Sequence, residues 1–240
     1  MSRRILIVTP TYNEKENLEV FLQGVFGVRS DVHVLVVDDN SPDGTGVLAD
    51  RLAEEDSRVQ VMHRPGKLGL GSAYLDAFRW GLEQGYDVLM EMDTDLSHDP
   101  AYLPAFVEAV EQGADVVIGS RNIPGGGVEG WGPGRHFLSK GGSLYSRLIL
   151  GVRVRDLTSG YKAFRREVLE AIDLNEVGSE GYSFQVELTY RALRRGFRVH
   201  EVPIVFVDRR AGQSKMSRKI FVEAVMMIPR LRLRALRGKL

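Results

Sequence analysis

Short runs of aliphatic residues alternate along this chain with longer stretches whose apolar residues recur at helical spacing, and few architectures accommodate that alternation. The predicted strands are residues 5–8, 32–37, 59–62, 88–92, 115–119 and 199–207. The predicted helices are residues 16–28, 45–56, 70–84, 102–111 and 137–150. Strands that are apolar throughout, rather than at every second residue, are typical of a parallel sheet covered on both faces. We therefore predict an α/β fold with an open, mostly parallel sheet and helices on both faces.

Polar segments follow the first four predicted strands directly. They are residues 9–14, 38–44, 63–67 and 93–95. Ligands of open α/β sheets bind beyond the carboxyl ends of the strands, so we expect these four segments to face one crevice. The Gly/Pro-rich residues 122–134 are predicted to form a mobile loop over it, because long loops in compact domains are usually functional or disordered.

Composition excludes several classes of protein. With 240 residues and 43% hydrophobic content, the chain can bury one sizeable core. The absence of cysteine excludes disulfides, thiolate zinc sites and cysteine nucleophiles, and suits a reducing cytosol. The five histidines have no metal-ligand spacing. A formal net charge of +0 gives no reason to expect a nucleic-acid partner.

No segment of the sequence resembles an export signal or a membrane span. The first apolar run covers only residues 5–8, and Pro10 ends it. No stretch reaches the roughly 18 uncharged apolar residues of a spanning helix, and Glu223 interrupts the nearest candidate, residues 220–228. We therefore expect a cytoplasmic protein whose membrane contact is peripheral and on the cytoplasmic face.

The segment Asp93-Thr94-Asp95 carries the strongest chemical signal. Two carboxylates two residues apart at a strand end can both approach one hard cation, Mg²⁺ or Mn²⁺, and leave positions for phosphate oxygens. Such a cation neutralises a leaving diphosphate. The alternative is a solvated turn whose acids cap the next helix. Because the pair follows the fourth strand of this pattern, we favour the metal site.

A second acidic position, Asp39, follows the second predicted strand. A carboxylate there can accept hydrogen bonds from the base or ribose of a nucleoside. Capping of the following helix is the alternative role, and the neighbouring Ser41 and Asp43 suit it better than Asp39 does. We therefore assign Asp39 to nucleotide binding.

Basic residues gather after the last predicted strand. Arg209, Arg210 and Lys215 surround Gly212 and Ser214, so they can form a flexible loop that closes over diphosphate oxygens. A solvated charge cluster is the alternative. We favour phosphate binding for Arg209 and Lys215, but not for Arg210.

The C-terminal segment is strongly basic. Residues 209–240 contain ten Lys or Arg and one acid, Glu223. From residue 220 onward an apolar stripe lies beside a basic face, as in an interfacial helix on anionic lipid, although an ordinary helix packed on the sheet has the same pattern. We divide the chain into a catalytic domain, residues 1–215, and a basic amphipathic membrane-surface tail, residues 216–240.

Several motifs together resemble a known family. They are Pro10–Glu14, Val37–Gly44, Asp93–His98, Gly119–Arg121, the segment with Trp131, Arg135 and Ser139, and Phe206–Lys215. In this order they resemble the dolichol-phosphate (polyprenol-phosphate) mannosyltransferases of glycosyltransferase family 2. The resemblance extends from near Arg4 to near Lys219.

The resemblance implies a nucleotide-diphosphosugar transferase fold of the GT-A type and a role for each matching position. The guanosine part of the donor would meet Pro10, Tyr12, Glu14, Val37 and Asp39. The nucleotide and the metal would meet Asp93, Thr94 and Asp95. The donor and acceptor phosphates would meet Arg121, Arg135, Ser139, Arg209 and Lys215, and the catalytic set would be Asp95, Arg121, Arg209 and Lys215. Relatives usually carry Ala at Thr94, and some carry Gln at Ser97, so we do not assign Ser97 to the metal.

The implied reaction is a single displacement in which a polyprenol (dolichol or undecaprenol) phosphate takes mannose from GDP-mannose with inversion of configuration. Three alternatives remain open from the residues alone. The donor could be a UDP-sugar, the acceptor could be a saccharide, or the chain could be a non-catalytic nucleotide-sugar-binding subunit. A nucleotidyltransferase ranks last, because the segment after the first strand is not Gly-rich. Whether a membrane-spanning partner subunit is needed is also left open.

Overall fold

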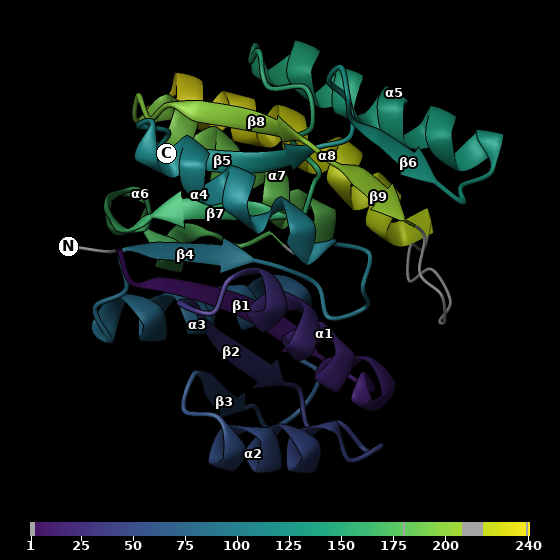
Figure 1. The fold of residues 1–240 in the computed structure, drawn as a ribbon. Coiled ribbons are helices and arrows are strands. Elements are labelled where there is room, and N and C mark those ends of the chain that lie inside the picture. The colour runs from purple at the N-terminus through teal and green to yellow at the C-terminus, as the bar shows by residue number, and fades with distance from the viewer. Residues whose placement is uncertain (1–2, 180, 208–217, 239) are drawn as a thin grey trace.

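The computed structural model describes residues 3–179, 181–207, 218–238 and 240, and these form a main sheet of seven strands with helices on both sides (Figure 1). The strand order is β3-β2-β1-β4-β7-β5-β8. The strands are β1 (Ile5–Thr11), β2 (His33–Asp38), β3 (Val59–His63), β4 (Val88–Glu91), β5 (Val116–Ser120), β7 (Lys162–Arg165) and β8 (Val199–Pro203). Only β7 runs antiparallel to its neighbours in this sheet. The predicted α/β class and mostly parallel sheet are confirmed.

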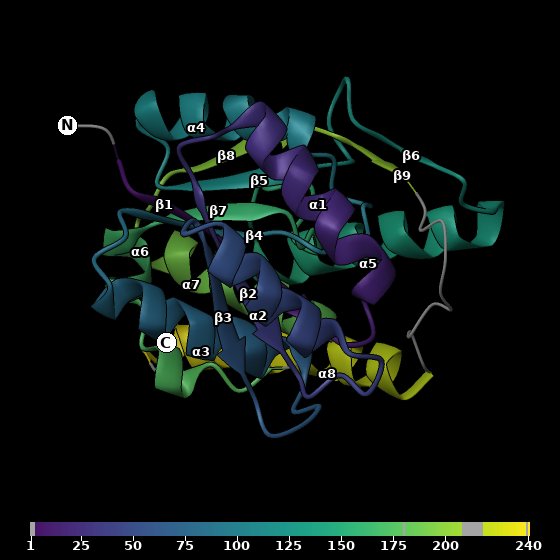
Figure 2. The same cartoon turned by 60° about the horizontal axis from the view of Figure 1, so that its bottom comes forward.

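Helices cover both faces of the sheet, as Figure 2 shows for α1 and α4 on one side and α3, α7 and α8 on the other. Successive side chains of a strand point to opposite faces, so Ile5 and Ile7 pack with α1 and α4, while Leu6 and Val8 pack with α3 and α7. The helices are α1 (Lys15–Val28), α2 (Thr45–Glu55), α3 (Leu70–Glu83), α4 (Leu103–Glu111), α5 (Pro133–Leu150), α6 (Arg166–Ala171), α7 (Gly181–Arg194) and α8 (Arg218–Leu236), with short 3₁₀ turns η1 (Pro100–Tyr102) and η2 (Leu174–Glu176). Two apolar cores result.

The last predicted strand, residues 199–207, is divided in the structure. β8 ends at Pro203, which has no N–H to continue the ladder, and the chain then leaves the main sheet. Its continuation β9 (Val205–Val207) pairs in parallel with β6 (Gly127–Glu129). The segment 122–134, predicted as a loop, therefore contains a strand.

Strand β7 was not predicted, because it is short and begins with the charged Lys162. It lies between β4 and β5, antiparallel to both. Lys162, Ala163 and Phe164 are buried, and the charged Lys162 is fully inaccessible. Position in the middle of the sheet, rather than local hydrophobicity, makes this segment a strand.

The second half of α8 packs onto the body of the protein. Ile228, Leu231 and Ala235 are buried in the core shared with α3 and α7. Arg232 donates hydrogen bonds to the carbonyl of Leu150 (3.1 Å) and to the hydroxyl of Tyr190 (3.2 Å). This part of the predicted tail thus shows the packing of an ordinary helix, and the predicted boundary at 215/216 lies outside the described residues. Within the part of the chain that the structure describes, no helix has both the length and the apolar character to cross a bilayer.

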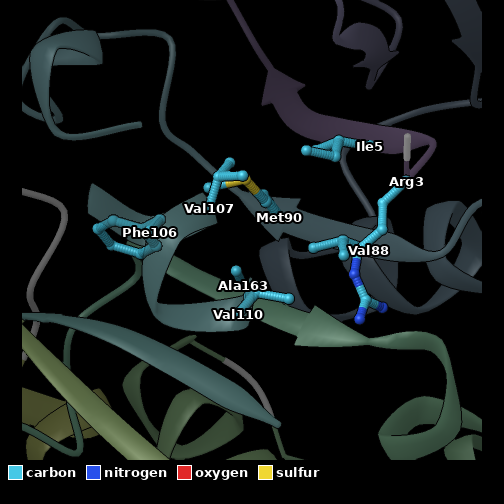
Figure 3. Close-up of a pocket in the computed structure, with 8 residues that line it drawn as sticks. All are labelled: Arg3, Ile5, Val88, Met90, Phe106, Val107, Val110 and Ala163. Carbon is cyan, nitrogen blue, oxygen red and sulfur yellow. The ribbon is translucent and has the colours of Figure 1, made fainter. Parts of the chain in front are cut away.

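A small apolar pocket lies between the amino-terminal half of the sheet and α4 (Figure 3). Apart from Arg3, apolar residues line it, including Ile5 and Val88 at the starts of β1 and β4. These residues are at the strand edge opposite to Asp93 and Asp95. The pocket is a small gap in the packing of the core, and we do not regard it as a candidate functional site.

Replacement of Gly81 in α3 tests how tightly that helix packs on the sheet. A Cβ at Gly81 would lie 2.5 Å from Leu89 Cδ2 and 2.9 Å from Leu6 Cδ2, so Gly81→Ala should lower the free energy of unfolding by about 1–3 kcal/mol. Gly27→Ala in α1 is the matched control, because nothing lies within 4 Å of its Cβ. It should raise the same free energy by up to about 1 kcal/mol. Urea unfolding measures both, and equal effects would contradict the close packing.

Candidate active site

The chemistry-bearing segments share one edge of the sheet because β2, β1 and β4 are parallel neighbours. Each of these strands is followed by a residue in the left-handed region: Asn13 (φ 62°), Asn40 (φ 57°) and Leu96 (φ 63°). A positive φ costs energy in residues other than glycine, most of all in a bulky one such as Leu96. Such strain concentrates at functional sites, and here it occurs after each of three neighbouring strands.

Hydrogen bonds join the ends of β1 and β2. Thr11 Oγ1 donates to Asp38 Oδ1 (3.1 Å), and the backbone N–H of Asn13 donates to Ser41 Oγ (3.1 Å). The backbone N–H of Glu14 donates to Thr45 Oγ1 (3.0 Å). Turn residues after β2 therefore hold the segment after β1, and we call these two segments together the wall of the candidate site.

Asp39 lies in a buried, basic corner of this wall. Its Oδ1 is 3.0 Å from Arg64 Nη1, and both side chains are less than 10% exposed. Burial raises the pKa of Asp39 above its ordinary value, although the Arg64 guanidinium opposes the shift. Lys67 Nζ lies 4.2 Å from the centre of the Tyr12 ring. A carboxylate beside an aromatic ring and two cations can bind the polar edge of a base that stacks on the ring.

The other residues that we expected at the nucleoside lie in the same wall. Pro10 and Val37 are register partners on β1 and β2, and Val37 is fully buried. Glu14 is half-buried and accepts a hydrogen bond from Asn17 Nδ2 (2.8 Å). Sequence reasoning did not single out Arg64, although it lies within the polar segment after the third strand.

The Asp93–Asp95 turn is fixed by short hydrogen bonds. Thr94 Oγ1 and Thr9 Oγ1 are 2.6 Å apart, which ties the turn to β1. Asp95 Oδ1 accepts from the backbone N–H of Ser97 (3.1 Å) and from its hydroxyl (2.5 Å). Asp93 Oδ1 accepts from the hydroxyl of Tyr74 (3.3 Å). Hydrogen bonds from neighbouring groups thus hold the two carboxylates in fixed orientations.

His98 has a structural role in this turn. Its Nδ1 accepts a hydrogen bond from the backbone N–H of Asp93 (3.0 Å). Its ring stacks on Tyr161 at 4.9 Å between centroids and meets Phe206 edge-on at 5.8 Å. We infer that His98 holds the Asp93 backbone, since Nδ1 is used as an acceptor.

The carboxylate pair fits a hard divalent cation. Among the described residues, no group of three or more His, Cys, Asp or Glu side chains is arranged as a metal site. Mg²⁺ and Mn²⁺ do not need one, because such ions commonly bind one or two carboxylates and complete their shell with water and substrate phosphates. Asp93 and Asp95 supply that number of ligands, at the strand edge where substrates of open α/β folds bind.

A buried polar layer supports the turn from inside the sheet. Glu91, the residue two before Asp93, is fully buried opposite Lys162 of β7. Burial raises the pKa of Glu91 to about 8 and lowers the pKa of Lys162 to about 8, in both cases against the attraction between them. Lys162 Nζ donates to the carbonyl of Gln185 (2.7 Å) and to Thr189 Oγ1 (2.9 Å). The sequence contained one sign of this layer, a glutamate inside an aliphatic run.

Arg121 follows β5 and is locked by Asp156. Nε and Nη2 of Arg121 donate to the two carboxylate oxygens of Asp156, each at 2.7 Å, and Asp156 is fully buried. Burial by itself raises the pKa of Asp156, but the charge and hydrogen bonds of Arg121 outweigh it and lower that pKa. Asp156 was not predicted, because it lies outside the polar segments after the strands that we considered.

Aromatic contacts bring Arg121 to the same side of the molecule as the Asp93–Asp95 turn. The Arg121 guanidinium lies 5.7 Å from the centre of the Phe206 ring and 5.8 Å from that of Trp131. Phe206 in turn contacts His98. The structure thus connects Arg121 with the carboxylate turn through one side chain.

Three expected site residues, Arg135, Arg209 and Lys215, are described only in part or not at all. Ser139 is half-buried in the second turn of α5, and Arg135 lies in the same helix, but its side chain is outside the described part. Arg209 and Lys215 lie outside the described residues. Their phosphate-binding roles stay predictions.

The comparisons with known proteins agree on one family. The family model "Glycosyl transferase family 2" matches residues 6–173. The chain is 53% identical over 228 residues to a polyprenol monophosphomannose synthase from Mycolicibacterium smegmatis, covering 95% of this chain and 86% of the relative. It is 52% identical over 227 residues to an undecaprenyl-phosphate mannosyltransferase from Micrococcus luteus, covering 95% and 93%.

Two solved structures share the fold. Glucosyl-3-phosphoglycerate synthase from Mycobacterium tuberculosis, solved with Mn²⁺, UDP and glucosyl-3-phosphoglycerate, superposes with a TM-score of 0.65 at 20% identity, covering 99% of this chain and 80% of that one. A mannosyltransferase from Pyrobaculum calidifontis, in complex with GDP-Man and Mn²⁺, gives a TM-score of 0.61 at 18% identity, covering 100% and 72%. At this identity the likeness supports the fold alone.

Substitution of two neighbouring glycines tests whether the loop after β5 holds the backbone at Arg121 in place. A Cβ at Gly126 would lie 2.4 Å from the carbonyl oxygen of Ser120, so Gly126→Ala must displace the backbone beside Arg121. Gly127→Ala has nothing within 4 Å and is the control. With Trp80→Phe leaving Trp131 as the single tryptophan of the chain, Gly126→Ala should change the Trp131 emission spectrum and cost about 1–3 kcal/mol of unfolding free energy. Gly127→Ala should leave the emission spectrum and the unfolding free energy unchanged. An identical response of the two variants would show that the loop does not hold the backbone at Arg121.

Proposed function

This chain belongs to glycosyltransferase family 2, and we propose that it transfers mannose from GDP-mannose to the phosphate of a membrane polyprenol such as dolichol or undecaprenol. The observation that carries the proposal is the identity of 52–53% over 95% of the chain to two relatives named for mannose transfer to polyprenyl phosphates. The oriented Asp93–Asp95 pair, the Asp39 corner and the buried Arg121 supply what such a reaction needs. The products are polyprenyl phosphate mannose and GDP.

The chemistry is a single displacement. A phosphate oxygen of the acceptor attacks the anomeric carbon, the bond from that carbon to the diphosphate breaks, and its electron pair leaves with GDP. The acceptor is already an anion near neutral pH, so no strong general base is required. Alignment of two phosphate-bearing substrates and stabilisation of charge then provide the catalysis.

Each group of residues has a part in this proposal. Tyr12 and Asp39 hold the guanosine, and Arg64 fixes the Asp39 carboxylate. Asp93 and Asp95 would hold Mg²⁺ or Mn²⁺, which when bound neutralises the leaving diphosphate. A relative in fold carries GDP-Man and Mn²⁺ together, which supports a divalent cation without distinguishing the two metals.

The basic residues would position the phosphates. Arg121 is pre-oriented by its bidentate pair with Asp156, so it can meet a phosphate without losing further side-chain freedom. Arg135 and Ser139 of α5 are assigned to the acceptor phosphate, and Arg209 and Lys215 to the donor phosphates. We further propose that the enzyme works peripherally at the cytoplasmic face of the membrane that contains its acceptor.

The direct test is a transfer assay with purified protein. Radiolabelled GDP-mannose, UDP-glucose and UDP-N-acetylglucosamine are each offered with polyprenyl phosphate, in the presence of Mg²⁺, of Mn²⁺ or of a chelator. We expect label in the lipid phase only from GDP-mannose and only with a metal. Consumption of a UDP-sugar alone would show the donor to be wrong, and transfer to a free saccharide would show the acceptor to be wrong.

Asp95→Asn tests the metal carboxylates. Asparagine keeps the shape and can still accept from Ser97, but it removes a charged metal ligand worth several kcal/mol, so kcat should fall by about a hundredfold or more. Asp99→Asn is the matched control, since Asp99 is exposed in the same turn and caps η1 by accepting from the N–H of Ala101 (2.8 Å). It should keep its activity. An unchanged rate and metal requirement in Asp95→Asn would remove this carboxylate from the mechanism.

A further inference from the structure

The second half of helix α5 places two serines inward and two leucines outward, which is the reverse of what an ordinary surface helix does. Its inward face buries Ser143 (3% exposed) and Ser146 (1%) together with Leu150. Its outward face exposes Leu144 (52%) and Leu148 (72%), which are one turn apart and adjacent on the helix surface. A helix that packs on a soluble core normally places leucines inside and serines outside. Water is therefore not the expected environment of the outer face of α5.

The charge around this face has one sign. Residues 130–155 contain five Lys or Arg and no Asp or Glu. Of these basic residues, Lys140, Arg153 and Arg155 are exposed, and they lie within or just after α5. Exposed leucines flanked by basic side chains form the pattern that binds an anionic lipid surface, where the leucines enter the acyl boundary and the cations meet the headgroups.

The apolar stripe of the C-terminal helix is used differently. Ile228, Leu231 and Ala235 of α8 are buried against the body of the protein. This half of the helix cannot turn those residues to a bilayer without exposing the core. Helix α5, which lies beside α8, exposes its leucines instead (Figure 1).

Helix α5 is also joined to the site. Asn122, the neighbour of Arg121, donates from Nδ2 to Ser143 Oγ on the inner face of α5 and to the carbonyl of Arg155, both at 3.3 Å. Figure 1 shows α5 and β6 beyond the carboxyl end of β5, where Arg121 lies. A bilayer against the outer face of α5 would place lipid headgroups near Arg121.

We infer that the outer face of α5, centred on Leu144 and Leu148 and flanked by Lys140 and Arg153, is the surface by which the enzyme docks on an anionic bilayer. The inference rests on the proposed function, because a polyprenol phosphate is held in a membrane. Two observations favour a lipid surface as the occupant. The helix exposes leucines while it buries serines, and the charged residues around the leucines are all basic. A second copy of the chain is the competing occupant, and the experiment separates the two.

The test uses the full chain and the double variant Leu144→Asp/Leu148→Asp. Co-sedimentation is measured with vesicles of phosphatidylcholine alone and of phosphatidylcholine mixed with phosphatidylglycerol. We expect the unmodified protein to bind the anionic vesicles more tightly, and the double variant to lose about tenfold or more in partitioning per leucine. Val47→Asp is the matched control, because Val47 is 76% exposed on α2, away from α5, and should leave binding unchanged.

A second readout compares two acceptors in the transfer assay. The double variant should lose transfer to polyprenyl phosphate embedded in anionic vesicles and keep transfer to a short, water-soluble isoprenyl phosphate. If the unmodified protein transfers mannose to neither acceptor, the proposed function fails, while the vesicle-binding result still judges the docking surface by itself.

Three results would overturn the inference. One is undiminished vesicle binding by the double variant. Another is loss of transfer to both acceptors with a lowered melting temperature, which would mean that the leucines support the fold. The third is a dimer of the unmodified protein that the double variant converts to monomer with vesicle binding unchanged, which would make α5 a contact between copies.

Discussion

The candidate site depends on one constraint, the central position of β1 between β2 and β4. Both pairings are parallel, so three strand ends meet at one edge of the sheet. Side-chain hydrogen bonds extend the pairing past the strands, from Thr11 to Asp38 on one side and between Thr9 and Thr94 on the other. The buried Asp39 corner and the carboxylate turn at Asp93 are thereby placed on either side of a single strand. If β1 were elsewhere in the sheet, these acids could not face a common ligand.

Buried ionisable groups are concentrated around this edge. Arg121 with Asp156 and Arg64 with Asp39 are buried ion pairs, and Glu91 and Lys162 are buried register partners on β4 and β7. Removing such charges from water costs more than their mutual attraction commonly returns, so buried pairs are weak sources of stability. Here each pair holds a residue of the site, or the layer beneath it, in a fixed orientation. We interpret the pairs as positioning devices that the apolar cores stabilise.

Particular residues show what could be predicted in advance. Asp93 and Asp95 were predicted as site residues because two acids directly after an aliphatic run are conspicuous, and Asp39 was predicted for the same reason. Asp156 and Lys162 were missed, because their importance comes from Arg121 and Glu91, which are 35 and 71 residues away in the sequence. Strand β7 was missed because a buried lysine in the middle of a sheet has no local signature. The roles of Arg209 and Lys215 rest on the sequence alone.

The local patterns could be predicted from the order of residues along the chain: the α/β class, the order of most strands and helices, and the acidic turns that follow β2 and β4. These depend on the periodicity of apolar residues and on turn chemistry, which are properties of neighbouring residues. Three features follow only from how distant segments pack together: β7 enters the sheet in reverse, Asp156 fixes Arg121, and α8 buries its apolar side while α5 exposes leucines. Those features depend on which distant segments pack against each other in the folded chain. The sequence of a single helix does not determine which of its faces another segment will cover.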